Sequence, residues 1–362
     1  MNTIFVTGGA GFIGSAVIRY LLKNTSIIII NIDKLTYAGN LNSVPKILIE
    51  KNKERYFFEK IDICNKLELK KLFLRYKPDG VMHLAAESHV DRSIDNADDF
   101  INTNIIGTYN LLDVSRYYLS SIDNTKYKNF KFHHVSTDEV YGDLKPHDES
   151  FKEETKYDPS SPYAASKASS DHLTRAWART YGLPIVISNC SNNYGPFHFP
   201  EKLIPISIIN AIKGNHLPVY GNGQQIRDWL YVDDHAEALV KVFTKGKLGE
   251  TYNIGGNNEV KNIDVVMYIC NLLDKKVKRK PFNILSFSNL IKYVDDRPGH
   301  DMRYSINNSK IKNSLGWSPK ETFDTGIEKT VDWFLNNRQW WEDILKSKYN
   351  LTRLGNKIKS EI

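Results

Sequence analysis

The sequence has only three cysteines and no long apolar run. Cys64, Cys190 and Cys270 are odd in number and lack the spacing of metal ligands, so we expect reduced structural thiols, no metal and a cytoplasmic protein. The densest apolar segment, "IIIINI" at 27–32, is far shorter than the ~20 residues that a membrane-spanning helix needs. The sequence therefore argues against a disulfide-stabilised fold, a metalloprotein and a membrane protein.

The chain also lacks a stretch of charge of one sign. It carries 49 Lys and Arg residues against 42 Asp and Glu residues, a formal net charge of +7, but the basic residues are interleaved with acidic ones. A nucleic-acid-binding protein usually gathers its basic residues in one patch or stripe, so we expect no nucleic-acid partner. At 362 residues, 41% of them apolar, the chain is long enough for about two domains around a large core.

A glycine-rich turn follows the first predicted strand. In "TIFVTGGAGFIGSAVIRYLL" a strand at 3–7 leads into a helix, and Gly8, Gly11 and Gly14 occupy the turn with the spacing G-x-x-G-x-x-G. This variant of the dinucleotide-binding motif lets backbone N–H groups approach a pyrophosphate at the helix N-terminus. Asp33 ends the second predicted strand, where an acid binds the adenosine ribose and would repel a 2′-phosphate. The segment therefore predicts NAD binding in preference to NADP.

Strands and helices alternate through the first half of the chain. Such alternation predicts an α/β protein with a Rossmann-like, doubly wound parallel sheet, whose ligands bind at the carboxyl ends of the strands. The predicted strands cover 56–63, 80–86, 130–137 and 185–190, and the predicted helices cover 66–76 and about 98–118. The residues at the strand ends are candidate cofactor contacts: Asp62, Ile63, Ala85, Ala86, Ser136 and Thr137.

A tyrosine and a lysine share one face of a predicted helix in "SPYAASKASSDHL". Tyr163 and Lys167 are four residues apart, and an ammonium beside a phenol lowers the tyrosine pKa toward neutrality. A base for alcohol oxidation needs such a pKa. The spacing Y-x-x-x-K is common by chance, but with the glycine turn and the Ser-Thr strand end it resembles the extended short-chain dehydrogenase/reductase superfamily.

The resemblance narrows to one family, because many long segments match in order from residue 3 to about 335. These segments are "VTGGAGFIGS", "HLAAESHVDRS", "HHVSTDEVYGDL", "SSPYAASKASSDHL", "NCSNNYGPFHFPEKLIP", "IRDWLYVDDHAEAL", "TYNIGG" and "DRPGHDMRY". Together they resemble the dTDP-glucose 4,6-dehydratase family. The resemblance implies a hydro-lyase that converts dTDP-glucose to its 4-keto-6-deoxy sugar, toward deoxysugars such as dTDP-rhamnose, with an NAD that is regenerated in each turnover.

The resemblance also assigns roles to the catalytic residues. Tyr163 would take the proton of the sugar 4-hydroxyl, Lys167 would lower its pKa, and Thr137 would hydrogen-bond the C4 oxygen. Glu139 would remove the C5 proton, and Asp138 would protonate the departing C6 hydroxyl. Because adjacent residues of a strand point to opposite faces, we expect the strand to end at about Thr137 so that both acids turn toward the sugar.

The binding residues implied by the resemblance fall into two sets, and no metal ligand is among them. The cofactor set is Gly8, Gly11, Phe12, Ile13, Gly14, Asp33, Lys34, Leu35, Thr36, Asp62, Ile63, Leu84, Ala85, Ala86, Ser88, Thr103, Ser136, Tyr163, Lys167 and Asn193. The substrate set is Ser88, Thr137, Asn192, Lys202, Leu203, Pro218, Val219, Tyr220, Arg227, Asn262, Arg297, His300 and Tyr349.

The predicted organisation has two interleaved parts. We expect residues 1–194, with parts of 224–257, to form the NAD-binding domain, and residues 195–223 and 258–350 to form a smaller sugar-nucleotide-binding lobe. Residues 351–362 are expected to form a flexible tail. By resemblance, the helices at about 98–118 and 163–181 form a four-helix bundle in a homodimer. His133, His134 and His198 are expected to pack or to form local hydrogen bonds.

Three alternatives remain open. A UDP-glucose 4,6-dehydratase differs in a substrate that lacks one methyl group, and such a group gives only ~1–3 kcal/mol of discrimination. A sugar-nucleotide 4-epimerase shares the glycine turn, Tyr163 and Lys167, but typically lacks the paired acids. A non-catalytic, NAD-sensing binding protein would be expected to lose the tyrosine or the lysine, and both are present.

Overall fold

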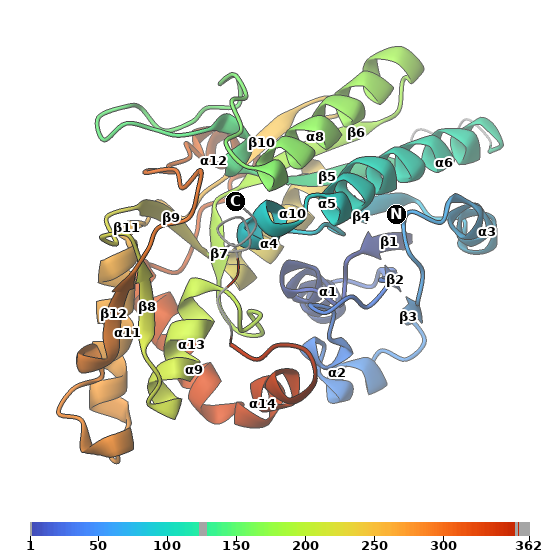
Figure 1. Cartoon of the computed structure of the whole chain (residues 1–362). Helices are drawn as coiled ribbons and strands as arrows, with labels where there is room; N and C mark the ends of the chain where they lie inside the picture. Colours follow the sequence, from blue (N-terminus) through green and yellow to red (C-terminus); the bar gives the residue numbers. More distant parts are fainter. Residues whose placement is uncertain (1, 123–128, 352–353, 355–362) are drawn as a thin grey trace.

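A seven-stranded parallel sheet forms the centre of the computed structural model, which describes residues 2–122, 129–351 and 354. The strand order is β10-β6-β5-β4-β1-β2-β3, so the order reverses between β1 and β4 (Figure 1). The predicted Rossmann-like α/β fold is confirmed. The strands are β1 (Thr3–Thr7), β2 (Ile28–Ile32), β3 (Tyr56–Glu59), β4 (Gly80–His83), β5 (Lys131–Thr137), β6 (Ile185–Cys190) and β10 (Thr251–Ile254).

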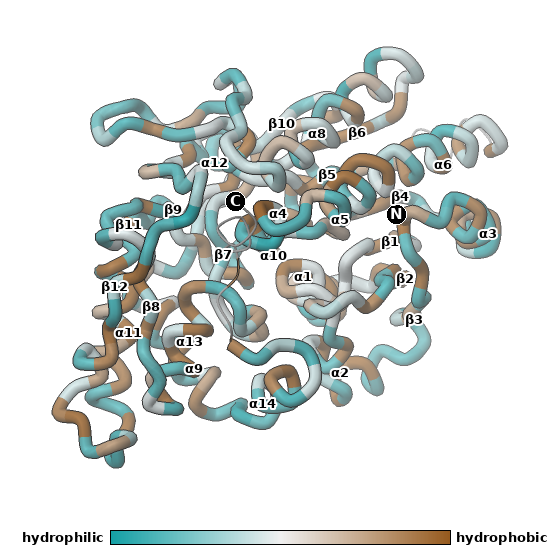
Figure 2. Tube along the Cα trace, in the orientation of Figure 1, coloured by the Kyte–Doolittle hydropathy of each residue, from teal (hydrophilic) through white to brown (hydrophobic). Residues whose placement is uncertain are grey.

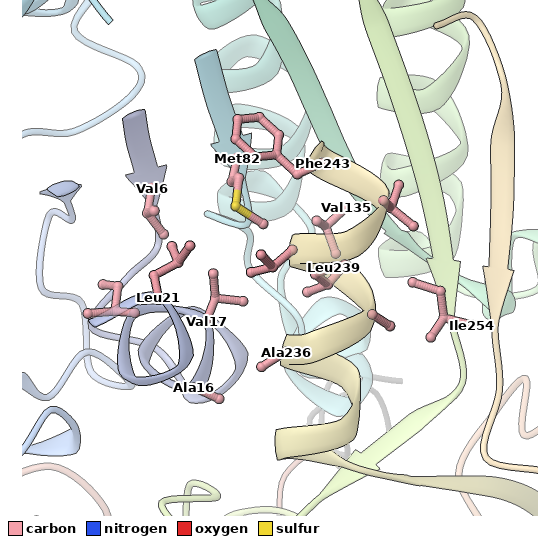
Figure 3. Close-up of a cluster of buried hydrophobic side chains, with 14 of the residues drawn as sticks. Val6, Ala16, Val17, Leu21, Met82, Val135, Ala236, Leu239, Phe243 and Ile254 are labelled. Atoms are coloured by element: carbon pink, nitrogen blue, oxygen red, sulfur yellow. The ribbon is translucent and has the colours of Figure 1, made fainter. Parts of the chain in front are cut away.

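One face of this sheet is covered by α1 (Phe12–Asn24) and α10 (Val232–Lys245). Figure 3 shows Val6, Met82 and Val135 on the strands, with side chains of α1 and α10 such as Leu21 and Leu239 beside them. Most of these side chains are fully buried. The spacing of apolar residues in the α1 segment therefore reflects a helix that packs on the sheet directly after the glycine turn.

The opposite face is covered by α3 (Lys66–Tyr76), α6 (Thr108–Ser120) and α8 (Pro162–Tyr181). Phe5 and Phe132 of the sheet pack there against apolar residues such as Leu111 of α6, all without solvent exposure. Ser161 caps α8 by accepting a hydrogen bond of 3.1 Å from the Ala164 N–H. This cap fixes the start of α8 at Pro162, one residue before Tyr163.

The second half of the chain adds two small sheets beside the main one. The sheets are built from β7 (Asn192–Tyr194), β9 (Ile226–Tyr231) and β11 (Glu259–Lys261), and from β8 (Leu217–Tyr220) and β12 (Ile291–Val294). A separate apolar cluster includes Trp229, Val265 and Phe334. Figure 2 shows both teal and brown residues in α14, which buries Trp341 and Ile344. The predicted division into two interleaved parts stays a prediction.

The remaining helices are shorter or belong to the second half of the chain. They are α2 (Lys46–Glu50), α4 (Val90–Asp95), α5 (Asp98–Phe100), the π-helix η2 (Ile101–Gly107), α9 (Leu203–Lys213), α11 (Asn262–Lys276), α12 (Ser309–Leu315), α13 (Phe323–Asn336) and α14 (Arg338–Ser347). The 3-10 helices are η1 (Leu41–Ser43), η3 (Asp138–Tyr141), η4 (Pro281–Asn283) and η5 (Phe287–Leu290). Among the described residues, no helix has both the length and the apolar character needed to cross a membrane.

Some predicted bounds are wrong. The strands predicted at 56–63 and 80–86 end at Glu59 and His83, and the chain then leaves the sheet. The helix predicted at about 98–118 is three segments, α5, η2 and α6, because a π-helix interrupts it. Within η2 the Asn104 side chain accepts a hydrogen bond from the Glu87 N–H and donates one to the Glu87 carbonyl. It also donates to Ser166 Oγ of α8, so it connects η2 to the turn after β4 and to α8. Most of the predicted tail, 352–353 and 355–362, lies outside the described residues.

Candidate active site

A cavity of about 440 Å³ opens at the carboxyl ends of the parallel strands, where the strand order reverses. The turns after β1, β4, β5 and β6 form one side of it, and residues of the second half, such as Lys202 and Arg297, form the other. Of the predicted site residues, all line this cavity except Leu35, Asp62 and Tyr349. Residues far apart in the sequence are therefore brought to one site as the motifs indicated.

The three exceptions lie close to the cavity. Asp62 accepts a hydrogen bond of 2.8 Å from the Cys64 N–H and lies 3.6 Å from Lys34 Nζ. Leu35 has a left-handed backbone, with φ of 58°, and its N–H donates to Asp33. Tyr349 is buried with its ring 6.2 Å from that of Phe199. Direct ligand contacts by these three residues stay predictions.

The glycine turn is packed so closely that side chains are excluded. Gly8 has a φ of +72°, and a Cβ there would lie 2.7 Å from Ala85 Cα. A Cβ on Gly14 would lie 2.1 Å from the Gly8 carbonyl oxygen. Helix α1 begins at Phe12 without a side-chain cap, so its first N–H groups stay available at the cavity. The turn is therefore shaped to hold an anionic group such as a pyrophosphate.

Asp33 is fixed by the backbone around it. Its Oδ2 accepts a hydrogen bond of 3.0 Å from the Ala10 N–H, and its Oδ1 accepts one of 2.8 Å from the Leu35 N–H. Burial raises the pKa of Asp33, although these two backbone bonds and the nearby Lys34 oppose the rise. Because each carboxylate oxygen can accept a further bond, Asp33 can still bind two neighbouring hydroxyls at the cavity.

Tyr163 and Lys167 lie on the cavity face of α8, both less than a tenth exposed. The Lys167 ammonium donates a hydrogen bond of 2.9 Å to the Val135 carbonyl. Burial and then the Glu139 carboxylate raise the pKa of Tyr163 well above its usual value, while a hydrogen bond with Thr137 lowers it. For the protein groups alone, the pKa of Tyr163 is thus raised and not lowered, because burial and Glu139 are the largest influences on it. The role of Lys167 stays a prediction.

The paired acids begin a short helical turn. Strand β5 ends at Thr137, as predicted, and the 3-10 helix η3 starts at Asp138. The Thr137 hydroxyl accepts a hydrogen bond of 3.3 Å from the Glu139 N–H and so caps this turn. The turn replaces the alternation of a strand, so Asp138 and Glu139 both line the cavity.

The two acids sit in different electrostatic environments. Burial raises the pKa of Asp138 well above its usual value, and Glu139 and Asp228 raise it further. Asp138 Oδ2 has no hydrogen-bond partner within the described part of the chain. Burial also raises the pKa of Glu139, but Arg297, Arg227 and Lys202 oppose that rise. Burial and like charges thus favour the protonated form of Asp138, whereas the three cations make Glu139 the more readily ionised acid.

Basic and amide groups gather on the other side of the cavity. Arg297 donates a hydrogen bond of 2.6 Å to Asp91 Oδ1, and its buried Nε has no partner among the residues described. Lys202 Nζ donates to the Ser88 carbonyl at 3.0 Å. Asn262 Oδ1 is a second buried polar atom that lacks a described partner. These groups can bind the diphosphate of a nucleotide, since guanidinium and ammonium groups pair with phosphate oxygens.

Comparison with known proteins gives a consistent result. The family model described as GDP-mannose 4,6 dehydratase matches residues 5–330. A dTDP-glucose 4,6-dehydratase from Escherichia coli is 60% identical over 360 residues, covering 97% of this chain and 99% of that protein. The chain belongs to the dTDP-glucose 4,6-dehydratase family. This confirms the resemblance that the sequence motifs indicated.

Solved structures of the dTDP-glucose 4,6-dehydratase family have the same fold. The enzyme from Bacillus anthracis, solved in complex with NAD, is 43% identical with a TM-score of 0.82, covering 95% of this chain and 100% of that one. The enzyme from Streptomyces venezuelae, solved with NAD and dTDP bound, is 39% identical with a TM-score of 0.84, covering 94% of this chain and 99% of that one.

Several cavity residues of this dTDP-glucose 4,6-dehydratase family member were not predicted. Glu201 accepts hydrogen bonds of 3.0 Å from Tyr37 OH and from Arg92 Nε, and Asp91 holds Arg297. The motifs "HLAAESHVDRS" and "NCSNNYGPFHFPEKLIP" contain Asp91 and Glu201, so a charged residue inside a matching motif was the available signal. His198 packs as expected, with its ring 4.2 Å from that of Phe12, but it also lines the cavity.

Proposed function

We propose that this protein removes water from dTDP-glucose to give dTDP-4-keto-6-deoxyglucose, with NAD as a cofactor that is regenerated in each turnover. The observation that carries the proposal is that the adjacent acids Asp138 and Glu139 both line the cavity that also holds Tyr163 and Lys167. A 4-epimerase needs only the tyrosine and lysine, whereas elimination of water also needs a base for C5 and an acid for the C6 hydroxyl.

The chain's own residues fit the cofactor. The side-chain-free turn at Gly8, Gly11 and Gly14 would hold the pyrophosphate, and Asp33 would accept hydrogen bonds from the adenosine ribose. When bound, NAD would be the oxidant that accepts a hydride from C4 of the sugar and returns it to C6, and its oxidised nicotinamide ring would add a positive charge to the cavity. Lys167 adds a second positive charge within the site.

Tyr163 acts first in this proposal, as the base that takes the proton of the sugar 4-hydroxyl. Its pKa is high in the protein alone, so its phenolate needs added positive charge in the cavity. Thr137, which already hydrogen-bonds Tyr163, is placed to hold the C4 oxygen beside the phenol. Burial of Tyr163 and Lys167 keeps water away and strengthens the electrostatic interaction between them.

Glu139 and Asp138 then carry out the elimination. Once C4 is a ketone, the neighbouring C5 proton is acidic enough for Glu139 to remove, and three cations keep Glu139 available as a carboxylate. Asp138 holds a proton at neutral pH because burial and the neighbouring acids disfavour its charge, so it can protonate the departing C6 hydroxyl. Arg297 and Lys202 would meanwhile bind the diphosphate.

The first test is the reaction itself. We expect the purified protein to convert dTDP-glucose to a product that has lost one water, detected by mass spectrometry, and to convert UDP-glucose more slowly. The thymine methyl gives ~1–3 kcal/mol of discrimination, so the ratio of the two rates should be about 10–200. Absence of water loss from both substrates would contradict the proposal, and a new epimeric sugar without water loss would favour the epimerase.

The second test concerns the choice of cofactor. Asp33 faces the position of the adenosine ribose, so NAD should bind far more tightly than NADP, whose 2′-phosphate would meet the carboxylate. Asp33→Ala should reduce the difference between the two dissociation constants, measured by calorimetric titration of the cofactor-free protein. Equal affinities of the parent protein for NAD and NADP would refute this role.

The third test separates the two halves of the chemistry. Glu139→Gln retains Tyr163 and Lys167, so it should still oxidise C4 and then stall, with product turnover lowered by about 10²–10⁴-fold. Reduced-nicotinamide absorbance should accumulate on mixing with dTDP-glucose, while solvent deuterium fails to enter C5. Asp138→Asn should still allow exchange at C5 but lose water slowly.

The control for this test is Tyr163→Phe, which should give neither the absorbance nor the exchange, because C4 is never oxidised. Product formation by Glu139→Gln at the parent rate, with normal C5 exchange, would show that the two acids are not divided in this way.

We also propose a cytoplasmic homodimer built on η2, α6 and α8. The exposed faces of these helices carry Ile101, Ile106, Tyr117 and Tyr181, each more than two-fifths exposed. Such apolar side chains on adjacent helices suit a four-helix bundle between two copies. The three free cysteines are in keeping with a compartment that keeps thiols reduced.

The dimer proposal is tested by sedimentation equilibrium. The parent chain should have twice the monomer mass of 41.6 kDa. Ile106→Glu should shift the protein toward monomer, whereas Leu67→Glu, which changes a residue 64% exposed on α3, should not. A monomeric parent protein, or a dimer unaffected by Ile106→Glu, would count against this interface.

A further inference from the structure

A third buried acid lies on the same face of α8 as the tyrosine and the lysine. Tyr163, Lys167 and Asp171 follow one another at intervals of four residues, which places them along one stripe of the helix. Lys167 and Asp171 are 4% and 0% exposed. Asp171 does not line the cavity, so it stands behind the lysine and away from the ligand.

Asp171 is held in place from three sides. Its Oδ2 accepts hydrogen bonds of 2.8 Å from the Ser136 hydroxyl and of 2.8 Å from Tyr157 OH. His134 Nε2 lies 3.0 Å from its Oδ1. Tyr157 is itself fixed by bonds from Arg175 of 3.1 and 3.2 Å. Burial raises the pKa of Asp171, but His134, Lys167 and Arg175 lower it by more, and the two hydrogen bonds to Oδ2 also stabilise the charged form.

The other titratable groups around Lys167 supply no negative charge to it near neutral pH. On β4 and β5, burial lowers the pKa of His83 and lowers that of His134 to about 4, so both are neutral. At the end of β6, burial raises the pKa of Cys190, so it is a thiol. Beyond β5, burial raises the pKa of Asp138, which favours its uncharged form.

Two further charged groups, Glu139 and Arg175, influence neighbours of Lys167. Glu139 acts on Tyr163, and Arg175 acts on Asp171. Asp171, one helical turn from Lys167, is therefore the acid near it whose charged form the surroundings favour. Burial lowers the pKa of Lys167, and Asp171 is the largest influence that opposes this.

We propose that Asp171 is a positioning residue that keeps Lys167 positively charged, and so favours the phenolate and ammonium arrangement of Tyr163 and Lys167 once NAD is bound. The inference rests on the proposed role of Tyr163 as the base for C4 oxidation. Asp171 does not line the cavity, so it would touch neither cofactor nor sugar. It acts through Lys167. Its hydrogen bond from Ser136 also fixes the end of β5, where Thr137 is the last residue.

The proposal has a specific consequence for pH dependence. The pair with one proton has two arrangements, phenolate with ammonium, which is active, and phenol with neutral amine, which is not. Asp171 favours the first arrangement, because its charge stabilises the ammonium. At low pH both groups are protonated, and the rate depends on loss of the tyrosine proton while the lysine stays charged. Removing the Asp171 charge should therefore matter little at low pH and more as pH rises.

The test measures C4 oxidation alone in the full-length protein loaded with NAD. Glu139→Gln provides the background, since it should accumulate reduced nicotinamide, and Asp171→Asn is added to it. A nearby opposite charge shifts a pKa by ~1–3 units, so the rate of absorbance increase should fall by about tenfold or more at alkaline pH. At acid pH the two proteins should be within about twofold of each other.

Asp171→Ser is a second neutral variant, used if the asparagine variant does not fold, with bound NAD and circular dichroism as measures of folding. Tyr157→Phe is the matched control, because it removes one hydrogen bond to Asp171 but retains the charge. It should keep the pH dependence of the background protein.

A loss of rate that is equal at every pH would overturn the inference, because it indicates a purely structural role, and so would no loss at all. Absence of the absorbance in Glu139→Gln itself would contradict the proposed function and this inference with it. A rate loss confined to neutral and alkaline pH in the neutral variants, and missing in Tyr157→Phe, supports the inference.

Discussion

The parallel pairing of β4, β5 and β6 is the constraint on which the site depends. Their register places His83 beside His134, and Thr137 beside Cys190, so the chain leaves all three strands at one edge of the sheet. Every catalytic candidate is placed relative to this edge: Thr137 ends β5, the acids start the next turn, and Lys167 binds the Val135 carbonyl. A shift of one residue in the pairing of β5 would turn its side chains to the opposite face and dismantle the site.

Burial gives the cavity its chemistry, because a low dielectric makes small differences in surroundings large. Asp138 and Glu139 are neighbours in sequence, yet only Glu139 has Arg297, Arg227 and Lys202 together around it. The second half of the chain supplies all three cations, whereas η3, directly after β5, supplies both acids. The chemistry therefore depends on both halves of the chain, with neither half able to divide the roles of the acids by itself.

The parts of the site that follow from local sequence could be predicted, and those that depend on long-range pairing could not. Gly8 and Gly14 could be read directly, because only a missing side chain permits their close approach, and the end of β5 at Thr137 was also predicted correctly. Asp91 and Arg297 are 206 residues apart, and Arg92 and Glu201 are 109 apart, so no spacing rule joins them. The high pKa of Tyr163 was also missed, because helical spacing identifies the neighbouring lysine but does not show how deeply the tyrosine is buried.

The two buried acids Asp138 and Asp171 have opposite effects on stability, in keeping with their separate roles. The pKa of Asp138 is raised in the folded state, so the fold binds a proton that the unfolded chain releases, and stability falls as pH rises above the unfolded value of ~3.9. The pKa of Asp171 is lowered, so its contribution to stability is present above that value and is lost as pH falls through the folded pKa. The fold is thus weakened near neutral pH by the acid that must keep a proton for the leaving hydroxyl. Asp171, whose charge supports Lys167, stabilises the fold at the same pH. The hydrogen bonds from Ser136 and Tyr157 to Asp171 therefore offset part of the free-energy cost of burying Asp138.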